Sequence, residues 1–239
     1  MYRLCPFSVF TPRLNMHTVR VWDLPTRLFH WALVACVAGL VITANVGGRW
    51  MEWHGRLGLT VLSLLLFRLL WGFVGGHWSR FGNFLYGPST VLAYLRGEVR
   101  PEHRVGHNPL GMLSVIALLS ILLLQVGTGL FSDDEIAFTG PLVGLVSGDT
   151  VSLATKYHKS VGKLLVLLLV LLHVAAIVFH KLVKRDNLVR PMVLGDKQVD
   201  VAVLGSADSA GSRLLALVLW ALCAMAVYGL AGMGQAADG

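Results

Sequence analysis

The sequence predicts an all-α fold: an integral membrane helical bundle with a four-helix core and a fifth C-terminal transmembrane helix. Of the 239 residues, 55% are hydrophobic and only 14% are charged, proportions that a water-soluble domain does not have. The apolar residues also form uninterrupted runs, such as residues 164–172. A membrane β-barrel would instead alternate lipid-facing and lumen-facing residues, so helices are expected.

Five segments are long and apolar enough to cross a hydrocarbon core of about 30 Å, which takes roughly 20 helical residues. In chain order, they are expected at Leu28–Val46, His54–Gly75, Leu110–Phe131, Tyr157–Leu182 and Leu214–Gly234. The leader before the first span has four arginines and no compact apolar core, unlike a secretory signal peptide. Between the second and third spans, residues 87–100 predict a short amphipathic surface helix with Ser89 as its N-cap.

These elements divide the chain into four parts. Residues 1–20 are expected as an N-terminal cytoplasmic tail and 21–196 as the four-helix core. Residues 197–212 are expected as a linker, flexible where Ser, Ala and Gly dominate at Gly205–Gly211, and 213–239 as the additional helix with a C-terminal tail.

Basic residues indicate how the bundle is oriented. Thirteen lie in the N-terminal tail, the second loop and the segment after the fourth span, against two in the first and third loops. Because cytoplasmic segments are enriched in Lys and Arg, the N-terminus is expected in the cytoplasm and, after five spans, the C-terminus outside. The net charge of +7 is thus explained by topology, and no nucleic-acid partner is expected.

The three cysteines do not indicate a functional site. Cys5, Cys36 and Cys223 are scattered and form no CxxC pair, so neither a disulfide framework nor a thiolate metal site is expected. No CxxCH motif occurs, so any haem would be held without thioether links.

Four of the nine histidines lie within or at the start of apolar spans, where ionisable side chains are costly and indicate function. His30 lies near the cytoplasmic end of the first span, and His54 opens the second span at the outer face. His158 opens the fourth span at the outer face, and His173 follows fifteen residues later, about 22 Å nearer the cytoplasm at 1.5 Å per residue. His54 and His158 therefore share the outer level, and His30 and His173 the inner one.

Two imidazole pairs at two depths suit two haems, with each iron taking one axial nitrogen from either side. Fifteen residues turn an ideal helix about 60° past four full turns, which keeps His158 and His173 on broadly the same face. Three other interpretations stay open: structural interfacial histidines, a proton relay and a zinc site. A relay would need Asp or Glu inside the spans, where none occurs unless Glu52 is counted, and a zinc site would bring its four ligands together.

Small and basic residues near these histidines fit the haem hypothesis. Glycines allow a flat macrocycle to approach a helix backbone, although ordinary helix packing explains any one of them equally well; they are Gly55, Gly58, Gly127, Gly129 and Gly162. Basic side chains beside the sites are candidate partners for haem propionates: Arg27, Arg56, Arg68, Lys159 and Lys163. Arg68 is the most informative, because it interrupts the apolar run LLLFRLLWG.

The remaining histidines are weaker candidates. Solvated loops are expected for His17, His77 and His103, and an interfacial helix end for His180. His107 stands in GHNPLG just before the third span, where a helix-start turn and a functional contact are equally expected.

From about Val21 to Asp196, the chain resembles the prokaryotic cytochrome b561 family, which includes the cytochrome b subunits of nickel-iron hydrogenases. The motifs that carry the resemblance occur in the family's order: VWDLPTRLFHW, WMEWHGRLG, LLFRLLWGFVG, GHNPLG, TGLFSDD, YHKSVG and LLHVAA. The resemblance implies four core helices holding two b-type haems, with axial ligands at His30, His54, His158 and His173.

Two features depart from the family pattern. Its members commonly separate the two histidines of the fourth helix by fourteen residues, whereas this chain has fifteen. A local π-bulge or a tilted haem is expected to accommodate the difference. The fifth span is an addition to the family's core, and its role is open.

The resemblance implies electron transfer across a bacterial inner membrane, between quinone and a redox partner on the periplasmic side. Besides membrane lipid and quinone, a c-type cytochrome or a periplasmic dehydrogenase or hydrogenase is expected as partner. The acidic segment FSDDE in the third loop would attract a basic partner, and it is equally consistent with a solvated loop. Two other classes stay open: a stand-alone oxidoreductase, such as one that oxidises superoxide and reduces quinone, and a haem-free transporter or scaffold. An electron-carrier subunit is favoured, because bis-histidine ligation leaves no open iron position for a substrate.

Overall fold

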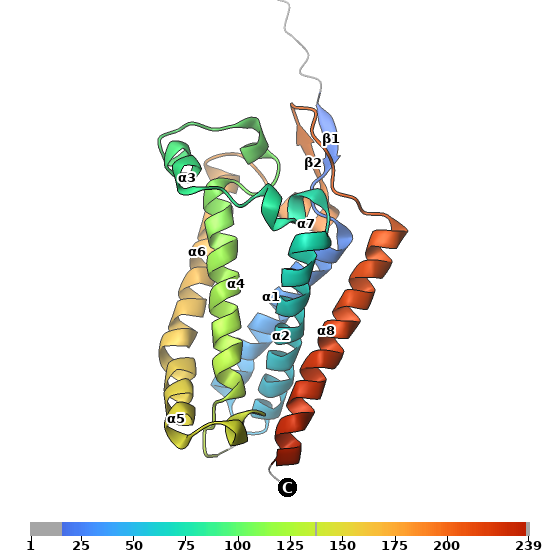
Figure 1. Ribbon diagram of the computed structural model, residues 1–239. Helices are drawn as coiled ribbons and strands as arrows, with labels where there is room; N and C mark the ends of the chain where they lie inside the picture. The colour runs from blue at the N-terminus through green and yellow to red at the C-terminus, as the bar shows by residue number, and fades with distance from the viewer. Residues whose placement is uncertain (1–15, 137, 238–239) are drawn as a thin grey trace, which may run out of the picture.

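The computed structural model describes residues 16–136 and 138–237, and in these residues five long helical runs form a bundle (Figure 1). The runs are α1 (Leu24–Val46), α2 (Trp50–Val74), α4 (Pro109–Leu130), the continuous run of α5 (Gly148–Tyr157), a π-helical turn (His158–Gly162) and α6 (Lys163–Leu182), and α8 (Ala210–Ala237). Each contains a stretch long and apolar enough to cross a membrane. The expected five-span helical bundle is confirmed, while Cys5 and most of the expected N-terminal tail lie outside the described residues.

Short elements close the two ends of the bundle (Figure 1). At one end, which we call the ribbon end, β1 (His17–Arg20) pairs antiparallel with β2 (Asp196–Val199). The short helices α3 (Pro88–Leu95) and α7 (Val189–Leu194) lie at the same end of the bundle. At the opposite end, the loop end, lie the α1–α2 turn and the α4–α5 loop. Short 3-10 turns complete the connections at His77–Ser79, Phe81–Asn83, Pro101–Arg104 and Val143–Leu145. The sequence analysis predicts neither strand. β1 falls in the expected N-terminal tail, and β2 falls around the start of the expected linker.

The first span begins one turn earlier than the hydropathy pattern predicts. Its helix starts at Leu24 rather than Leu28, because Asp23 acts as an N-cap and accepts the Thr26 N–H at 2.8 Å. Pro25 stands in the first turn, where the missing N–H of proline costs no hydrogen bond.

N-capping residues also differ from the prediction at the start of two other helices. The fourth run begins at Gly148 rather than Tyr157, because Ser147 caps the polar helix α5 ahead of the apolar stretch. The amphipathic helix expected between the second and third spans is present as α3, but its N-cap is Gly87 and not Ser89.

The long helices are not packed equally closely. α2 packs against α1 and α8, α4 packs against α2, and α6 packs mainly against α4. The hydrophobic core is centred on α2, where Val61, Leu65 and Trp71 are almost fully buried. Within the described residues, no comparable packing joins α6 to α1 or α2, so α6 faces these two helices across a separation.

The segment expected to be a flexible linker is held in place at the ribbon end. The Ser206 hydroxyl donates to the Val21 carbonyl at 2.7 Å. The Asp208 carboxylate accepts hydrogen bonds from Arg20 at 2.6 Å and from Arg213 at 2.9 Å. The structure corrects the expectation of flexibility: these bonds fasten the start of α8 to the segment that leads into α1.

Candidate functional site

The structure brings His30 and His173 together toward the ribbon end. His30 lies in the second turn of α1, and His173 lies in α6. Their ring centroids are 6.5 Å apart, with an angle of 53° between the ring planes. Two helices that do not pack against each other are thus linked by a pair of half-buried imidazoles.

His54 and His158 face each other toward the loop end. His54 lies in the second turn of α2, and His158 is the first residue of the π-helical turn. Their ring centroids are 6.2 Å apart, with an angle of 85° between the planes. The four histidines therefore form two pairs at two levels of the bundle, and each pair takes one member from the α5–α6 run.

The spacing of both pairs suits a metal between the rings. An imidazole nitrogen binds a first-row metal at about 2 Å and lies roughly 1.2 Å from its ring centroid, so two axial imidazoles place their centroids about 6.4 Å apart. The separations of 6.5 Å and 6.2 Å match this value. Among the described residues the histidines meet as pairs, and no group of three or more possible metal ligands is present.

At the His54–His158 pair, the hydrogen bonds found in the described residues involve only one nitrogen of each ring. His158 Nδ1 lies 2.8 Å from the Gln125 carbonyl oxygen, and His54 Nδ1 lies 3.2 Å from that of Leu40. A carbonyl only accepts, so in these bonds Nδ1 carries the hydrogen and Nε2 keeps its lone pair. This is the arrangement typical of metal-binding histidines.

The extra residue in the fourth span is absorbed by the π-helical turn. The turn covers His158–Gly162 and so lies between the two histidines of that span. A π-turn accommodates one additional residue, so the rest of the helix keeps the direction that a fourteen-residue separation would give. Of the two accommodations expected from the family resemblance, the π-bulge is confirmed.

Deleting Ser160 from the π-turn is expected to restore regular α-helix and leave His173 opposite His30. Deleting Leu168 from regular α6 should instead rotate His173 by about 100° relative to His158. Under the two-haem hypothesis, the first variant keeps both haems and the second loses one, as a pyridine haemochrome assay measures. Equal losses in both variants would show that the turn does not set the register.

Arg68 is a buried cation with no direct ion pair among the described residues, although the buried Asp23 carboxylate acts on it electrostatically from a longer distance. Arg68 is 3% exposed, its guanidinium carbon lies 4.9 Å from the Phe81 ring centroid, and its Nη1 has no hydrogen-bond partner in the described part of the chain. The ion pairs found there do not include Arg68. Buried charges are normally paired, so the environment of Arg68 fits an additional anion such as a haem propionate.

The other cations expected beside a haem are placed differently. Arg27 donates from Nη1 to the Val193 carbonyl at 2.6 Å, and its Nε is buried without a partner among the described residues. Arg56 pairs with Glu52 at the surface. Lys163 is exposed.

Two histidines in the connection before α4 are shielded from solvent: His103 is buried and His107 is partly buried. His103, expected in a solvated loop, is 5% exposed. Its Nδ1 accepts the Arg100 N–H at 3.2 Å, and the rings of Tyr86 and Tyr94 border it. The expectation for His103 is wrong because the chain folds back and brings these tyrosines over it. His107 is also enclosed, and in the sequence only the GHNPLG motif marks it.

Gly129 leaves room for the ring of His158. A Cβ at Gly129 would lie 2.9 Å from Cε1 of His158, whereas a Cβ at Gly127 would meet no atom within 4 Å. Gly129→Ala is therefore expected to displace the His158 ring and, under the two-haem hypothesis, to lower haem occupancy at the His54–His158 pair, while Gly127→Ala leaves it unchanged. Haem content and low-temperature electron paramagnetic resonance of the two variants measure this. The same effect from both would contradict the close approach.

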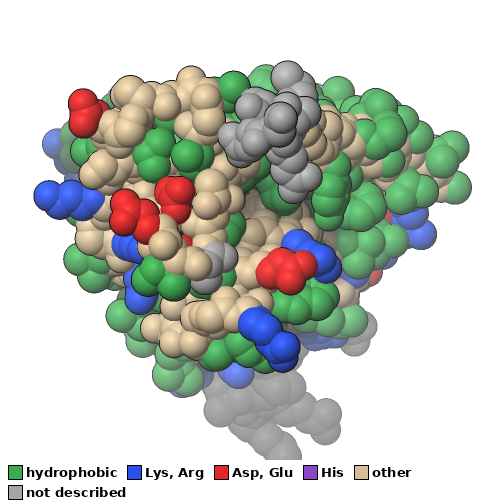
Figure 2. Space-filling model, turned by 90° about the horizontal axis from the view of Figure 1, so that it is seen from below, with side chains coloured by type: hydrophobic (Ala, Val, Ile, Leu, Met, Phe, Trp, Pro, Cys, Tyr) green, Lys and Arg blue, Asp and Glu red, His purple; other side chains and the backbone are tan. Residues whose placement is uncertain are grey.

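The acidic segment of the third loop lies at the loop end. Figure 2 shows this face, on which Asp and Glu side chains stand among apolar and uncharged ones, with Lys and Arg beside them. The Asp133 carboxylate accepts the Glu135 N–H at 2.7 Å, and the Asp134 carboxylate accepts the Phe138 N–H at 2.8 Å. These carboxylates therefore have a structural role within their own loop.

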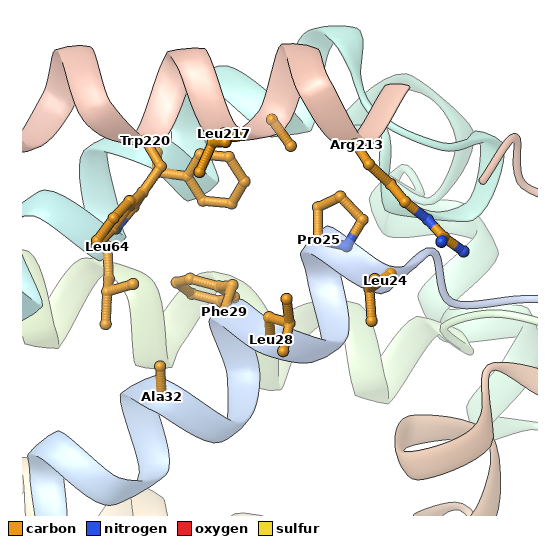
Figure 3. A pocket seen from close by; sticks show the side chains of 11 residues that line it. Leu24, Pro25, Leu28, Phe29, Ala32, Leu64, Arg213, Leu217 and Trp220 are labelled. Atoms are coloured by element: carbon orange, nitrogen blue, oxygen red, sulfur yellow. The ribbon is translucent and has the colours of Figure 1, made fainter. Parts of the chain in front are cut away.

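A cavity of about 450 Å³ opens between α1, α2 and α8 (Figure 3). Apolar side chains, among them Phe29, Leu217 and Trp220, line it, and Arg213 stands at one end. None of the four paired histidines lines this cavity, so it is separate from both pairs.

Comparisons with known proteins find one family and several relatives. A family model described as prokaryotic cytochrome b561 matches residues 21–195. A probable Ni/Fe-hydrogenase B-type cytochrome subunit of Bradyrhizobium diazoefficiens is 25% identical, over 76% of this chain and 86% of the relative. One from Azotobacter vinelandii is 25% identical, over 74% and 87%.

A third relative is covered less fully. The probable Ni/Fe-hydrogenase 1 B-type cytochrome subunit of Escherichia coli K12 is 26% identical over 50% of this chain, and the match spans 63% of that relative, less than two thirds of its length. No solved structure matches the chain.

Proposed function

Because the chain belongs to the prokaryotic cytochrome b561 family, we propose that it transfers electrons across the membrane through two b-type haems. The spacing of the histidine pairs carries this proposal, since each pair joins α1 or α2 to the α5–α6 run at the separation that one iron requires. In the proposal, His30 and His173 bind one iron, and His54 and His158 bind the other. Two irons at two depths divide the path across the bilayer into two shorter steps.

The protein residues supply ligands, orientation and charge. Haem iron, when bound, supplies the one-electron chemistry. The hydrogen bonds that His54 and His158 donate from Nδ1 hold their rings in position. They also make Nε2 a stronger electron-pair donor to a metal. Arg68 balances propionate charge inside the membrane, and Arg27, Arg56 and Lys163 are further candidates, of which Arg56 also pairs with Glu52.

The proposed orientation places the ribbon end in the cytoplasm and the loop end in the periplasm of a bacterial inner membrane. The excess of Lys and Arg in the segments at the ribbon end supports it. The N-terminus is then cytoplasmic and the C-terminus periplasmic. Residues 21–196 form the di-haem unit, 197–212 the connector, and 213–239 the additional span with its tail.

The partners proposed are quinone in the membrane and a hydrogenase on the periplasmic side. The relatives named above are probable Ni/Fe-hydrogenase subunits, which supports a hydrogenase. The acidic side chains at the loop end (Figure 2) would equally attract a basic c-type cytochrome. Electrons are proposed to pass between this partner and quinone through the two haems.

A difference spectrum tests the function. Protein expressed with ample haem and purified in detergent is expected to show a b-type spectrum when dithionite-reduced, with about two haems per polypeptide, and to be reduced by a quinol. A colourless protein would overturn the proposal and favour a transporter or scaffold. Quinone reduction by superoxide without any partner would instead favour a stand-alone oxidoreductase.

A further inference from the structure

His107 lies enclosed near the ribbon end with an unpaired ring nitrogen. Its ring centroid is 4.7 Å from that of Trp22 and 4.6 Å from that of Phe84. Its carbonyl accepts the Tyr86 hydroxyl at 3.0 Å, and Asn108 next to it caps α4. The ring and the backbone of His107 are therefore fixed in position. Its Nδ1 is nevertheless buried and has no hydrogen-bond partner among the described residues.

A series of ring contacts connects Arg68 to His107. The Arg68 guanidinium lies over the Phe81 ring, whose centroid is 5.8 Å from that of Phe84, and Phe84 in turn contacts the His107 ring.

Arg68 and His173 also act electrostatically on His107. Burial, followed by the charges of these two groups, lowers the pKa of His107 to about 3, so its imidazole is neutral at physiological pH. A neutral imidazole can donate one hydrogen bond but balances no charge. Arg68 can balance a charge. In the described residues no carboxylate forms a direct ion pair with it, and Asp23, which acts on it from a longer distance, already accepts hydrogen bonds from four other groups.

One ligand would satisfy both side chains. A buried guanidinium without a direct ion pair and a buried imidazole nitrogen without a hydrogen bond are each unfavourable. A carboxylate carries one negative charge and accepts several hydrogen bonds. It can pair with the guanidinium and accept the imidazole N–H at the same time.

We propose that Arg68 and His107 form one carboxylate-binding site, and, resting on the proposed function, that its ligand is a propionate of the haem held by His30 and His173. Arg68 supplies the charge, and His107 supplies a neutral N–H. His107 is then a positioning residue, which acts on the iron through the propionate. Trp22, which holds the His107 ring, directly precedes the α1 segment that carries His30.

The variant His107→Phe tests the proposal, because it keeps an aromatic ring between Trp22 and Phe84 but removes both nitrogens. An unbonded propionate places more negative charge near the iron and favours the oxidised haem. We expect the midpoint potential of one haem to fall by the equivalent of roughly a tenfold change in its redox equilibrium, about 59 mV, while the other haem is unchanged. Arg68→Gln should lower the same potential further.

Rescue and a matched control separate this role from packing. His107→Asn keeps an N–H near the position of Nδ1 and is expected to restore the potential. It also serves if His107→Phe does not fold. His103→Phe changes a buried histidine of the same connection, whose Nδ1 already accepts the Arg100 N–H, and should leave both potentials unchanged. Infrared difference spectra with ¹³C-labelled propionates should show a shifted carboxylate band in His107→Phe and Arg68→Gln, and not in His107→Asn or His103→Phe.

The outcomes distinguish this inference from the proposed function. Wild-type protein with two haems, together with unchanged potentials and carboxylate bands in His107→Phe, would overturn the inference alone. If His107→Phe does not fold, a changed potential or a shifted propionate band in His107→Asn, which keeps the N–H, would also count against it. Colourless wild-type protein would overturn both the inference and the proposed function.

Discussion

Replacing His158 with alanine is expected to remove one of the two proposed haems and to lower the content from about two per polypeptide to about one. His158 faces His54 at 6.2 Å, so alanine at either position leaves that iron with a single axial ligand. His30→Ala and His173→Ala should each remove the other haem. A pyridine haemochrome assay on purified protein measures the content, and a redox titration identifies which haem remains.

Double variants make this prediction sharper. Two changes within one pair act on the same iron, so His54→Ala with His158→Ala should lose no more haem than either change alone. One change from each pair, as in His30→Ala with His158→Ala, should remove both haems. His17→Ala, at an exposed position in β1, is the control. Four single variants that all keep two haems would contradict the ligand assignment.

Asp23→Ala is expected to cause a large loss of stability. Asp23 is fully buried, and its carboxylate accepts hydrogen bonds from the N–H groups of Thr26 and Gly76, the Trp71 indole and the Ser79 hydroxyl. Alanine leaves these donors buried without an acceptor, at a cost of roughly 1–3 kcal/mol each. Because some donors will find other partners, we expect the free energy of unfolding to fall by on the order of 4 kcal/mol.

Unfolding by SDS in mixed micelles, followed by tryptophan fluorescence, measures this loss. Asp23→Asn should be intermediate, because its amide keeps one acceptor but turns an NH₂ group toward other donors. Asp200→Ala is the control: its carboxylate is partly exposed and lies 4.0 Å from Arg104, so a change within about 0.5 kcal/mol is expected. Equal stability of the Asp23 and Asp200 variants would show that the buried carboxylate does not join α1 to the end of α2.

Most of the bundle could be predicted because membrane spans depend on local composition. A run of about 20 apolar residues in one segment is sufficient to identify a spanning helix, whatever the rest of the chain does. Errors occurred at helix ends, where single residues such as Asp23 and Ser147 decide the start. Their capping bonds are short-range, but hydropathy does not detect them.

The candidate site was predictable to the extent that it follows from distance along a helix. The levels of the four histidines follow from their positions in the spans and the rise of 1.5 Å per residue. Whether two rings at one level face each other depends on how the helices pack and rotate. The π-turn was anticipated only because the resemblance supplied a reference spacing.

By itself, the sequence determined the number of spans, the depth of each histidine and the presence of Arg68 in an apolar run. Only the tertiary structure decided that β1 pairs with β2, that Ser206 fastens the connector to Val21, and that His107 is enclosed by Trp22 and Phe84. The physical reason is the range of the interactions. Hydrophobicity and helical rise act within one segment, whereas these partners come from other segments of the chain and meet only after the helices have packed.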